Sequence, residues 1–122
     1  MGTLFNLIIL GFVVWFLYKR FIPAKGIKNI TVAELKAELN NKGSKQFIDV
    51  RTPNEYRGNH IKDFKNIPLS ELGKRAHELT KDKEVVVICQ SGMRSSNASK
   101  ALKKLGFKEV TNVKGGMNSW RQ

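Results

Sequence analysis

The sequence predicts an α/β domain with a mostly parallel central sheet flanked by helices, because short apolar segments alternate with helical patterns. Residues 84–89, Glu-Val-Val-Val-Ile-Cys, contain four consecutive β-formers and are typical of a central strand that is buried on both faces. After this strand, Ala98, Leu102 and Leu105 recur at helical spacing and share one face. This order of strand, loop and helix is the unit from which a parallel sheet is built.

The other strands are assigned in chain order from short β-forming runs. We expect an edge strand at 27–30, a second strand at 46–50 and a last strand at 108–113. Together with the central strand they place one domain in residues 27–122, after a short linker at 23–26. A domain of about a hundred residues has room for a single hydrophobic core.

The helices between these strands are assigned from capping residues and apolar stripes. Thr31 followed by Glu34 forms a capping box and opens the first helix. Ser70 is expected to cap a second helix, and Gly106 to end the third. The apolar stripes of the first two helices are Val32, Leu35 and Leu39, and Leu72, Ala76 and Leu79.

Residues 1–22 are predicted to form a transmembrane helix that anchors the domain. The run 2–18 carries no charge, although at about 1.5 Å per residue it is a little short for a hydrocarbon core of about 30 Å. Extension to Ile22 closes that gap if Lys19 and Arg20 reach toward the headgroups. A cleaved signal peptide fits less well, because no basic residue precedes the apolar run.

The charges beside this segment predict its orientation. Lys19, Arg20, Lys25 and Lys28 all flank its C-terminal end, and positive residues stay on the cytoplasmic side of a membrane. The domain is therefore expected to face the cytoplasm, where a thiol remains reduced. The lipid bilayer is the expected partner of residues 1–22.

The overall charge and the cysteine content exclude several classes of protein. The chain of 122 residues has 22 Lys and Arg against 10 Asp and Glu, but the lysines are scattered, so we expect no nucleic-acid partner. A single cysteine excludes an intramolecular disulfide and a cysteine-rich metal site. The two histidines do not supply a metal site either, so neither a metal nor another cofactor is expected.

Cys89 stands where an α/β sheet binds ligands, at the carboxyl end of the central strand. The loop Cys-Gln-Ser-Gly-Met-Arg-Ser is short, and Gly92 allows it to turn tightly. Backbone N–H groups that point inward and the start of the next helix would hold Cys89 as a thiolate nucleophile. The alternative is a buried structural cysteine. The candidate substrate-binding residues are Gln90, Ser91, Gly92, Met93 and Arg94, whose guanidinium offers a fixed cation for an anion.

This loop, Cys-x-x-Gly-x-Arg after a strand, resembles the active-site loop of single-domain rhodaneses, which are thiosulfate sulfurtransferase-like proteins. Four more segments resemble family motifs in the family's order and extend the likeness over residues 27–122. They are Asp49-Val50-Arg51-Thr52-Pro53-Asn54-Glu55-Tyr56, Gly58-Asn59-His60-Ile61 with Asn59 inserted, Asn66-Ile67-Pro68-Leu69, and Gly115-Gly116-Met117-Asn118-Ser119-Trp120.

The resemblance implies a sulfur-transfer reaction through a persulfide. The Cys89 thiolate would attack the outer sulfur of thiosulfate or a similar anionic donor, and the N–H groups of residues 90–94 would hold the resulting persulfide. A thiol or cyanide would then accept the sulfur. The alternative within this reading is a membrane-bound persulfide relay or binding module with little thiosulfate turnover. A cysteine phosphatase fits less well, because its loop has five residues between Cys and Arg, whereas Cys89 and Arg94 enclose four.

The resemblance also places Asp49 and Arg51 near the rim of the pocket as supporting residues. We expect a structural ion pair, for example between Arg51 and Glu55, and direct catalysis by Asp49 or Arg51 is the less favoured alternative. His60 is expected to fix a turn, and Met117 and Trp120 to close the core.

Overall fold

The structure of the protein, a computed structural model, describes residues 2–21 and 26–120. In the described part, five parallel strands form one sheet in the order β1-β5-β4-β2-β3. The strands are β1 (Ile27–Ile30), β2 (Gln46–Asp49), β3 (Lys65–Asn66), β4 (Val85–Ile88) and β5 (Val110–Val113). The predicted α/β class with a parallel sheet is therefore confirmed, and β4 is the central strand.

The register of the strands sets the position of the candidate site. Asp49, the last residue of β2, is paired with Ile88, the last residue of β4. Val50 and Cys89 therefore leave the sheet side by side at its carboxyl edge. The short strand β3 next to β2 was not among the predicted elements, because two residues give no periodic signal.

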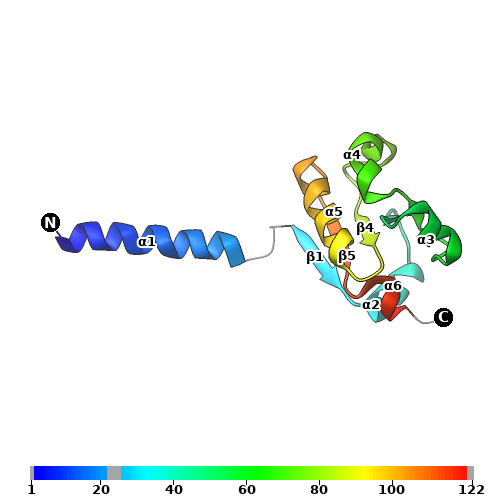
Figure 1. Cartoon of the computed structure of the whole chain (residues 1–122), viewed down its shortest axis with the longest axis horizontal. Helices are drawn as coiled ribbons and strands as arrows, with labels where there is room; N and C mark the ends of the chain where they lie inside the picture. Colours follow the sequence, from blue (N-terminus) through cyan, green and yellow to red (C-terminus); the bar gives the residue numbers. More distant parts are fainter. Residues whose placement is uncertain (1, 22–25, 121–122) are drawn as a thin grey trace.

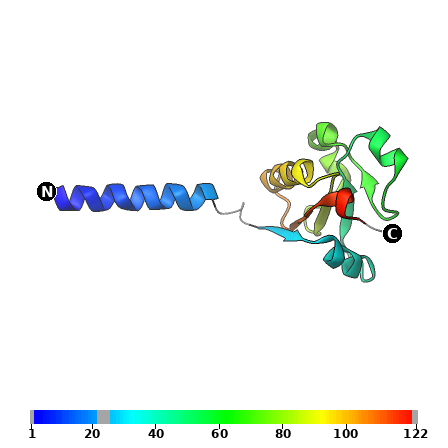
Figure 2. The same cartoon turned by 60° about the horizontal axis from the view of Figure 1, so that its bottom comes forward.

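Helices cover both faces of the sheet (Figures 1 and 2). On one face, helix α5 (Met93–Lys104) and α4 (Leu72–Arg75) contribute Leu72, Ala98 and Leu102 to a core that includes Val85 and Val87. On the other face, α2 (Val32–Leu39) and α6 (Gly116–Ser119) pack against Val86 and Ile88. The alternation along β4 agrees with a strand that is buried on both sides.

Two helical segments differ from the prediction. The helix expected from Ser70 is divided into a 3-10 turn (Leu69–Glu71), the single turn α4 and a second 3-10 turn (Ala76–Glu78), and Ser70 caps none of them. Gly73 within this stretch weakens a regular helix, while the apolar residues still pack on the core. Helix α3 (Pro53–Gly58) was not predicted as a helix; it begins at a capping box formed by Thr52 and Glu55.

The N-terminal segment forms helix α1 (Gly2–Phe21), which lies apart from the sheet in both views (Figures 1 and 2). In the described ranges, no helix has the length and apolar character that a membrane crossing requires. The predicted transmembrane anchor over residues 1–22 is therefore not supported. The uncharged run 2–18 reaches only about 26 Å at 1.5 Å per residue, and the chain beyond it brings Lys19 and Arg20. The cytoplasmic orientation stays a prediction, and the predicted linker falls largely outside the described residues.

Candidate active site

The loop from Cys89 to Gly92 joins the central strand β4 to helix α5. Gly92 is the N-cap residue of α5 and has a φ of 106°, a left-handed conformation that favours glycine. Its position lets the loop turn back on itself within three residues. The predicted order of strand, tight loop and helix is confirmed at this point.

The sulfur of Cys89 lies inside this loop and accepts backbone hydrogen bonds. The N–H of Gly92 donates to Sγ at 2.9 Å, and the Ser95 hydroxyl oxygen lies 3.3 Å from Sγ. Burial of the thiol raises its pKa, but hydrogen bonds from the Ser95 hydroxyl and from the N–H groups of Ser95, Gly92 and Ser91 outweigh burial, so the pKa of Cys89 is lowered. The loop therefore favours the thiolate, the nucleophilic form.

The Cys89 side chain has an exposed fraction of 0%. A water molecule cannot reach Cys89 in this structure, and the sulfur atom of a donor is larger than a water molecule. A donor can therefore contact Sγ only if the atoms that cover it move.

The predicted loop residues divide into two groups. Ser91 and Gly92 direct their N–H groups at the sulfur, as predicted. Gln90 instead binds neighbours with its side chain: its Oε1 accepts from Arg51 at 3.1 Å, and its Nε2 donates to Asn118 at 2.6 Å. The side chain of Met93 is largely in solvent, since the residue is 75% exposed.

Ser95 is a site residue that the sequence analysis did not select. It lies in the first turn of α5, is buried, and its hydroxyl sits between Sγ and the carbonyl of Gly92, 3.1 Å from the latter. With the thiol protonated, S–H donates to this hydroxyl; with the thiolate, the hydroxyl turns and donates to sulfur. The sequence could have indicated this role, because Ser95 is a small polar residue on the core side of the helix that follows the candidate nucleophile.

Removal of the Ser95 hydroxyl should shift the ionisation of Cys89. In Ser95→Ala we expect the pKa of the thiol to rise, because one hydrogen bond to the thiolate is lost, and the rate of alkylation at neutral pH to fall about three- to tenfold. The measurement is the pH profile of iodoacetamide alkylation. Ser99→Ala is the matched control, since Ser99 is buried one turn later and donates only to the Ser95 carbonyl at 2.7 Å. Equal profiles for both variants would exclude this role.

Asp49 and Arg51 form a buried ion pair that supports the loop from the neighbouring strand. The guanidinium of Arg51 donates to both Asp49 carboxylate oxygens, the shortest at 2.8 Å, and the two residues are 3% and 0% exposed. The nitrogen Nη2, which binds Asp49, also donates to the carbonyl of Asn59 at 2.6 Å, and Nη1 donates to the Gln90 side chain at 3.1 Å. Arg51 thus joins β2, the end of α3 and the cysteine loop. The expected pairing of Arg51 with Glu55 is wrong.

Glu55 is paired with Arg94 instead. Its two carboxylate oxygens accept from the Arg94 guanidinium at 2.6 and 2.9 Å, in a bidentate arrangement. Hydrogen bonds from Arg94, and further ones from Thr52, hold the pKa of Glu55 at about 2 in spite of the opposing effect of burial. Arg94 is thus near the loop, as predicted, but it does not present a free cation to a donor. Local sequence could not predict this pair, because Glu55 belongs to the capping box of α3 and Arg94 lies 39 positions further along the chain.

Helix α6 holds the base of the loop through its backbone. The N–H of Met117 donates to the Cys89 carbonyl at 2.8 Å, and the N–H of Asn118 donates to the Gln90 carbonyl at 2.9 Å. Gly116 permits this close approach, because a Cβ added there would lie 2.2 Å from the Cys89 carbonyl oxygen. Met117 is buried in the core, as expected, and Trp120 packs partly against it.

His60 and Asn66 stabilise turns around the site. The His60 ring stacks on Tyr56 with centroids 3.9 Å apart, and its Nδ1 lies 2.8 Å from the Tyr56 carbonyl. The Asn66 amide donates to the carbonyls of Asp49 and Arg51 at 3.0 Å each. The expected role of His60 in a turn agrees with these contacts.

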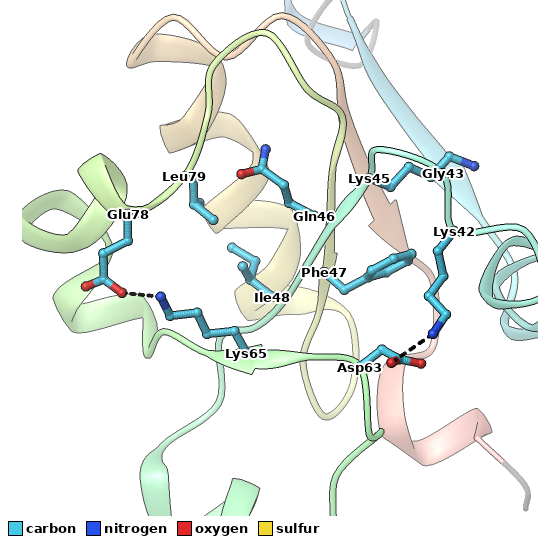
Figure 3. A pocket seen from close by; sticks show the side chains of 10 residues that line it. All are labelled: Lys42, Gly43, Lys45, Gln46, Phe47, Ile48, Asp63, Lys65, Glu78 and Leu79. Atoms are coloured by element: carbon cyan, nitrogen blue, oxygen red, sulfur yellow. Dashed lines mark hydrogen bonds and ion pairs between the residues drawn. The ribbon is translucent and has the colours of Figure 1, made fainter.

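A hollow of about 410 Å³ lies at the amino-terminal half of strands β2 and β3, away from Cys89. Four of its five charged side chains pair with one another, because Lys42 binds Asp63 at 3.1 Å and Lys65 binds Glu78 at 2.6 Å (Figure 3). Its apolar wall comes from Phe47 and Leu79. This hollow has no nucleophile and is not the candidate site.

Within the described ranges, no group of three or more His, Cys, Asp and Glu side chains could hold a metal ion. The chemistry available at the carboxyl edge of the sheet is that of a hydrogen-bonded thiolate. Such a thiolate can attack an electrophilic sulfur, and the same N–H groups can then hold the negative charge of a persulfide.

Comparison with known proteins identifies the class to which this fold and loop belong. The family model of the rhodanese-like domain matches residues 31–122, and the chain belongs to this family. A rhodanese-like domain protein from Staphylococcus aureus has a similar structure, with a TM-score of 0.73 and 32% identity over 78% of this chain and 92% of that one.

Two relatives from Bacillus subtilis cover most of both sequences. The uncharacterized protein YqhL is 37% identical in an alignment of 119 positions that covers 94% of this chain and 92% of YqhL. The putative sulfurtransferase YtwF is 42% identical over 94 residues, which are 77% of this chain and 90% of YtwF. These similarities support a transferase of sulfur-containing groups.

Proposed function

We propose that the protein is a sulfurtransferase that carries a sulfane sulfur as a persulfide on Cys89. The observation that carries this proposal is the hydrogen bond from Gly92 N–H to Sγ at 2.9 Å, in a loop that lowers the thiol pKa. Membership of the rhodanese-like domain family supports the same chemistry. Thiosulfate is the predicted donor, and a thiol or cyanide the predicted acceptor.

The reaction has two nucleophilic steps at sulfur. The Cys89 thiolate attacks the outer sulfur of thiosulfate, a new S–S bond forms, and sulfite leaves with the electron pair of the broken bond. The charge of the resulting persulfide is held by the N–H groups of Ser91, Gly92 and Ser95. An acceptor thiolate then attacks the outer sulfur, and the Cys89 thiolate leaves. The donor itself supplies the oxidation level of the transferred sulfur, so no further oxidant or reductant is consumed.

The second candidate function is a persulfide relay that turns over thiosulfate poorly. The observation that favours it is the bidentate pairing of Arg94 with Glu55, which leaves less positive charge for an inorganic dianion. Both candidates use the same persulfide on Cys89. They differ in the donor and in the rate of its turnover.

A mass measurement tests the shared intermediate. The full chain incubated with excess thiosulfate should gain about 32 Da, cyanide should remove this mass, and Cys89→Ser should show no gain. A stoichiometric gain with slow turnover would support the relay, and a gain with fast turnover would support the enzyme. An unmodified mass with thiosulfate and with an organic persulfide would contradict both. Rapid hydrolysis of an aryl phosphate instead would support phosphatase chemistry.

A further inference from the structure

Each arginine that borders the cysteine loop is matched by one carboxylate. The guanidinium of Arg51 is paired with the Asp49 carboxylate, with a shortest N–O distance of 2.8 Å. The guanidinium of Arg94 is paired with the Glu55 carboxylate, with N–O distances of 2.6 and 2.9 Å. Both pairs sum to zero charge. The attack of a thiolate on thiosulfate brings three negative charges together, and these two pairs offer no net cation to offset them.

The pairing of Arg94 is fixed by more than one contact. Glu55 Oε1 also accepts from the N–H and the hydroxyl of Thr52, at 3.0 and 3.1 Å, as part of the cap of α3. The carboxylate is therefore held in place by the helix start as well as by the guanidinium. A donor that required Arg94 would have to compete with an oriented carboxylate.

An apolar pocket adjoins this ion pair. It has a volume of about 320 Å³ and is lined by Val50, Thr52, Pro68, Leu69, Ser70 and Arg94. Val50 also belongs to the same packed core as Cys89, and Arg94 lies in the first turn of α5, two residues after Gly92, so the pocket lies beside the loop. A volume of this size holds about ten water-sized groups. Its lining suits carbon rather than an inorganic oxyanion.

We propose that the site selects organic sulfane-sulfur donors with at most one negative charge and a small apolar group, and that Glu55 sets this selectivity. Persulfides of thiols are the natural compounds of this class. The donor's carbon group occupies the pocket of Val50, Pro68 and Leu69, while its terminal sulfur enters the loop. Glu55 acts through Arg94 and does not touch the reacting atoms, so it is a positioning residue. This inference rests on the proposed sulfur transfer.

The chemistry of this donor class balances. The Cys89 thiolate attacks the terminal sulfur of R–S–SH, the S–S bond of the donor breaks, and R–S⁻ leaves with the electron pair. The proton stays on the transferred sulfur, and Cys89 holds –S–SH, which can lose that proton to solvent. No oxidant or reductant takes part.

Three donors separate the effect of charge from the effect of the carbon group. Thiosulfate carries two charges, methanethiosulfonate carries one with a methyl group, and benzenethiosulfonate carries one with a ring. We expect kcat/KM of the full chain to rise in this order, by at least about tenfold between the first and the last. Thiosulfate as the best donor would overturn the proposal. If none of these donors nor an organic persulfide leaves sulfur on Cys89, sulfur transfer itself fails.

Glu55→Gln tests the charge effect. Glutamine keeps an oxygen for the Thr52 cap but removes the charge that offsets Arg94. We expect the KM for thiosulfate to fall about three- to tenfold, with kcat nearly constant and little change for benzenethiosulfonate. Added salt should reduce the difference. An unchanged KM for thiosulfate in a folded variant would contradict the role of Glu55.

Two further variants control for net charge and for the cap. Glu34→Gln makes the same change in the capping box of α2, where Glu34 accepts from Thr31 at 3.1 Å, and should leave the donor preference unchanged. The double variant Glu55→Gln, Arg94→Gln restores zero charge and should return the thiosulfate KM to its original value. If the double variant keeps the gain, the effect does not arise from the charge of Arg94. The comparison of the three donors on the unaltered chain decides the proposal should a variant not fold.

Ser70→Phe tests the pocket. Ser70 is exposed at its rim, so a ring there would fill the space without disturbing the core. We expect the KM for benzenethiosulfonate to rise at least about fivefold and that for thiosulfate to stay the same. An equal effect on both donors would place the carbon group elsewhere.

Discussion

Replacement of Gly116 by alanine is expected to disable Cys89 although the thiol itself is unchanged. The added Cβ would lie 2.2 Å from the Cys89 carbonyl oxygen and 2.9 Å from the carbonyl carbons of Cys89 and Gln90. These are backbone atoms, so no side chain can move aside. Gly116 also has a φ of 53°, which strains any L-residue with a side chain. The loop must therefore shift away from α6.

This shift should be visible in both rate and ionisation. A displacement of about 1 Å at a reacting group can cost about a hundredfold in rate, and we expect a loss of that size in persulfide formation. The pKa of Cys89 should rise, because the N–H of Gly92 would no longer be aligned with Sγ. Gly73→Ala is the control: a Cβ at Gly73 meets nothing within 4 Å, so activity should be retained. Full activity of Gly116→Ala would mean that α6 does not position the loop.

The second large effect is expected at the buried ion pair of Asp49 and Arg51. Asp49→Asn leaves the guanidinium of Arg51, which is 3% exposed, without its opposite charge. Breaking a buried pair in this way costs about 3–5 kcal/mol, a large part of the stability of a small domain. Urea denaturation measures this loss. The folded fraction should also transfer sulfur more slowly, since Arg51 orients Gln90 in the loop.

The partly exposed pair of Lys42 and Asp63 provides the matched control for Asp49→Asn. Its side chains are 50% and 32% exposed, at 3.1 Å. Solvent screens such a pair, so Asp63→Asn should change the free energy of unfolding by less than about 1 kcal/mol. Similar losses for the two variants would show that the Asp49 pair is no more important than a surface contact.

The parts of the fold that could be predicted are those with a strong local pattern. The apolar run of β4 and the periodic residues of α5 identify the central unit, and the Thr31 and Glu34 capping box marks the start of α2. Strand β3 and helix α3 are too short for a periodic signal. The stretch 69–78 keeps the apolar spacing of one helix but is broken into turns, because packing on the core does not require a continuous helix.

At the site, the residues of the loop were predictable and their partners were not. Cys89 and Gly92 could be selected from the sequence, because a nucleophilic side chain and a glycine that permits a tight turn occur within four positions after an apolar strand. Arg94 and Glu55 are 39 positions apart, and only the folded chain shows that they form a pair. The partner of Arg51 could not be predicted either, because the sequence offers two carboxylates close to it, Asp49 and Glu55, and only the structure shows that Asp49 binds it. Charge alone did not distinguish them.

The contacts of α6 make the reactivity of Cys89 depend on a distant part of the chain. Residues 116–118 fix the carbonyls of Cys89 and Gln90, although they follow Cys89 by more than 25 positions. Proteolytic cleavage between the loop and this segment would leave the cysteine at the end of β4 but would free the backbone contacts that position its loop. The thiol would then lose the geometry that lowers its pKa.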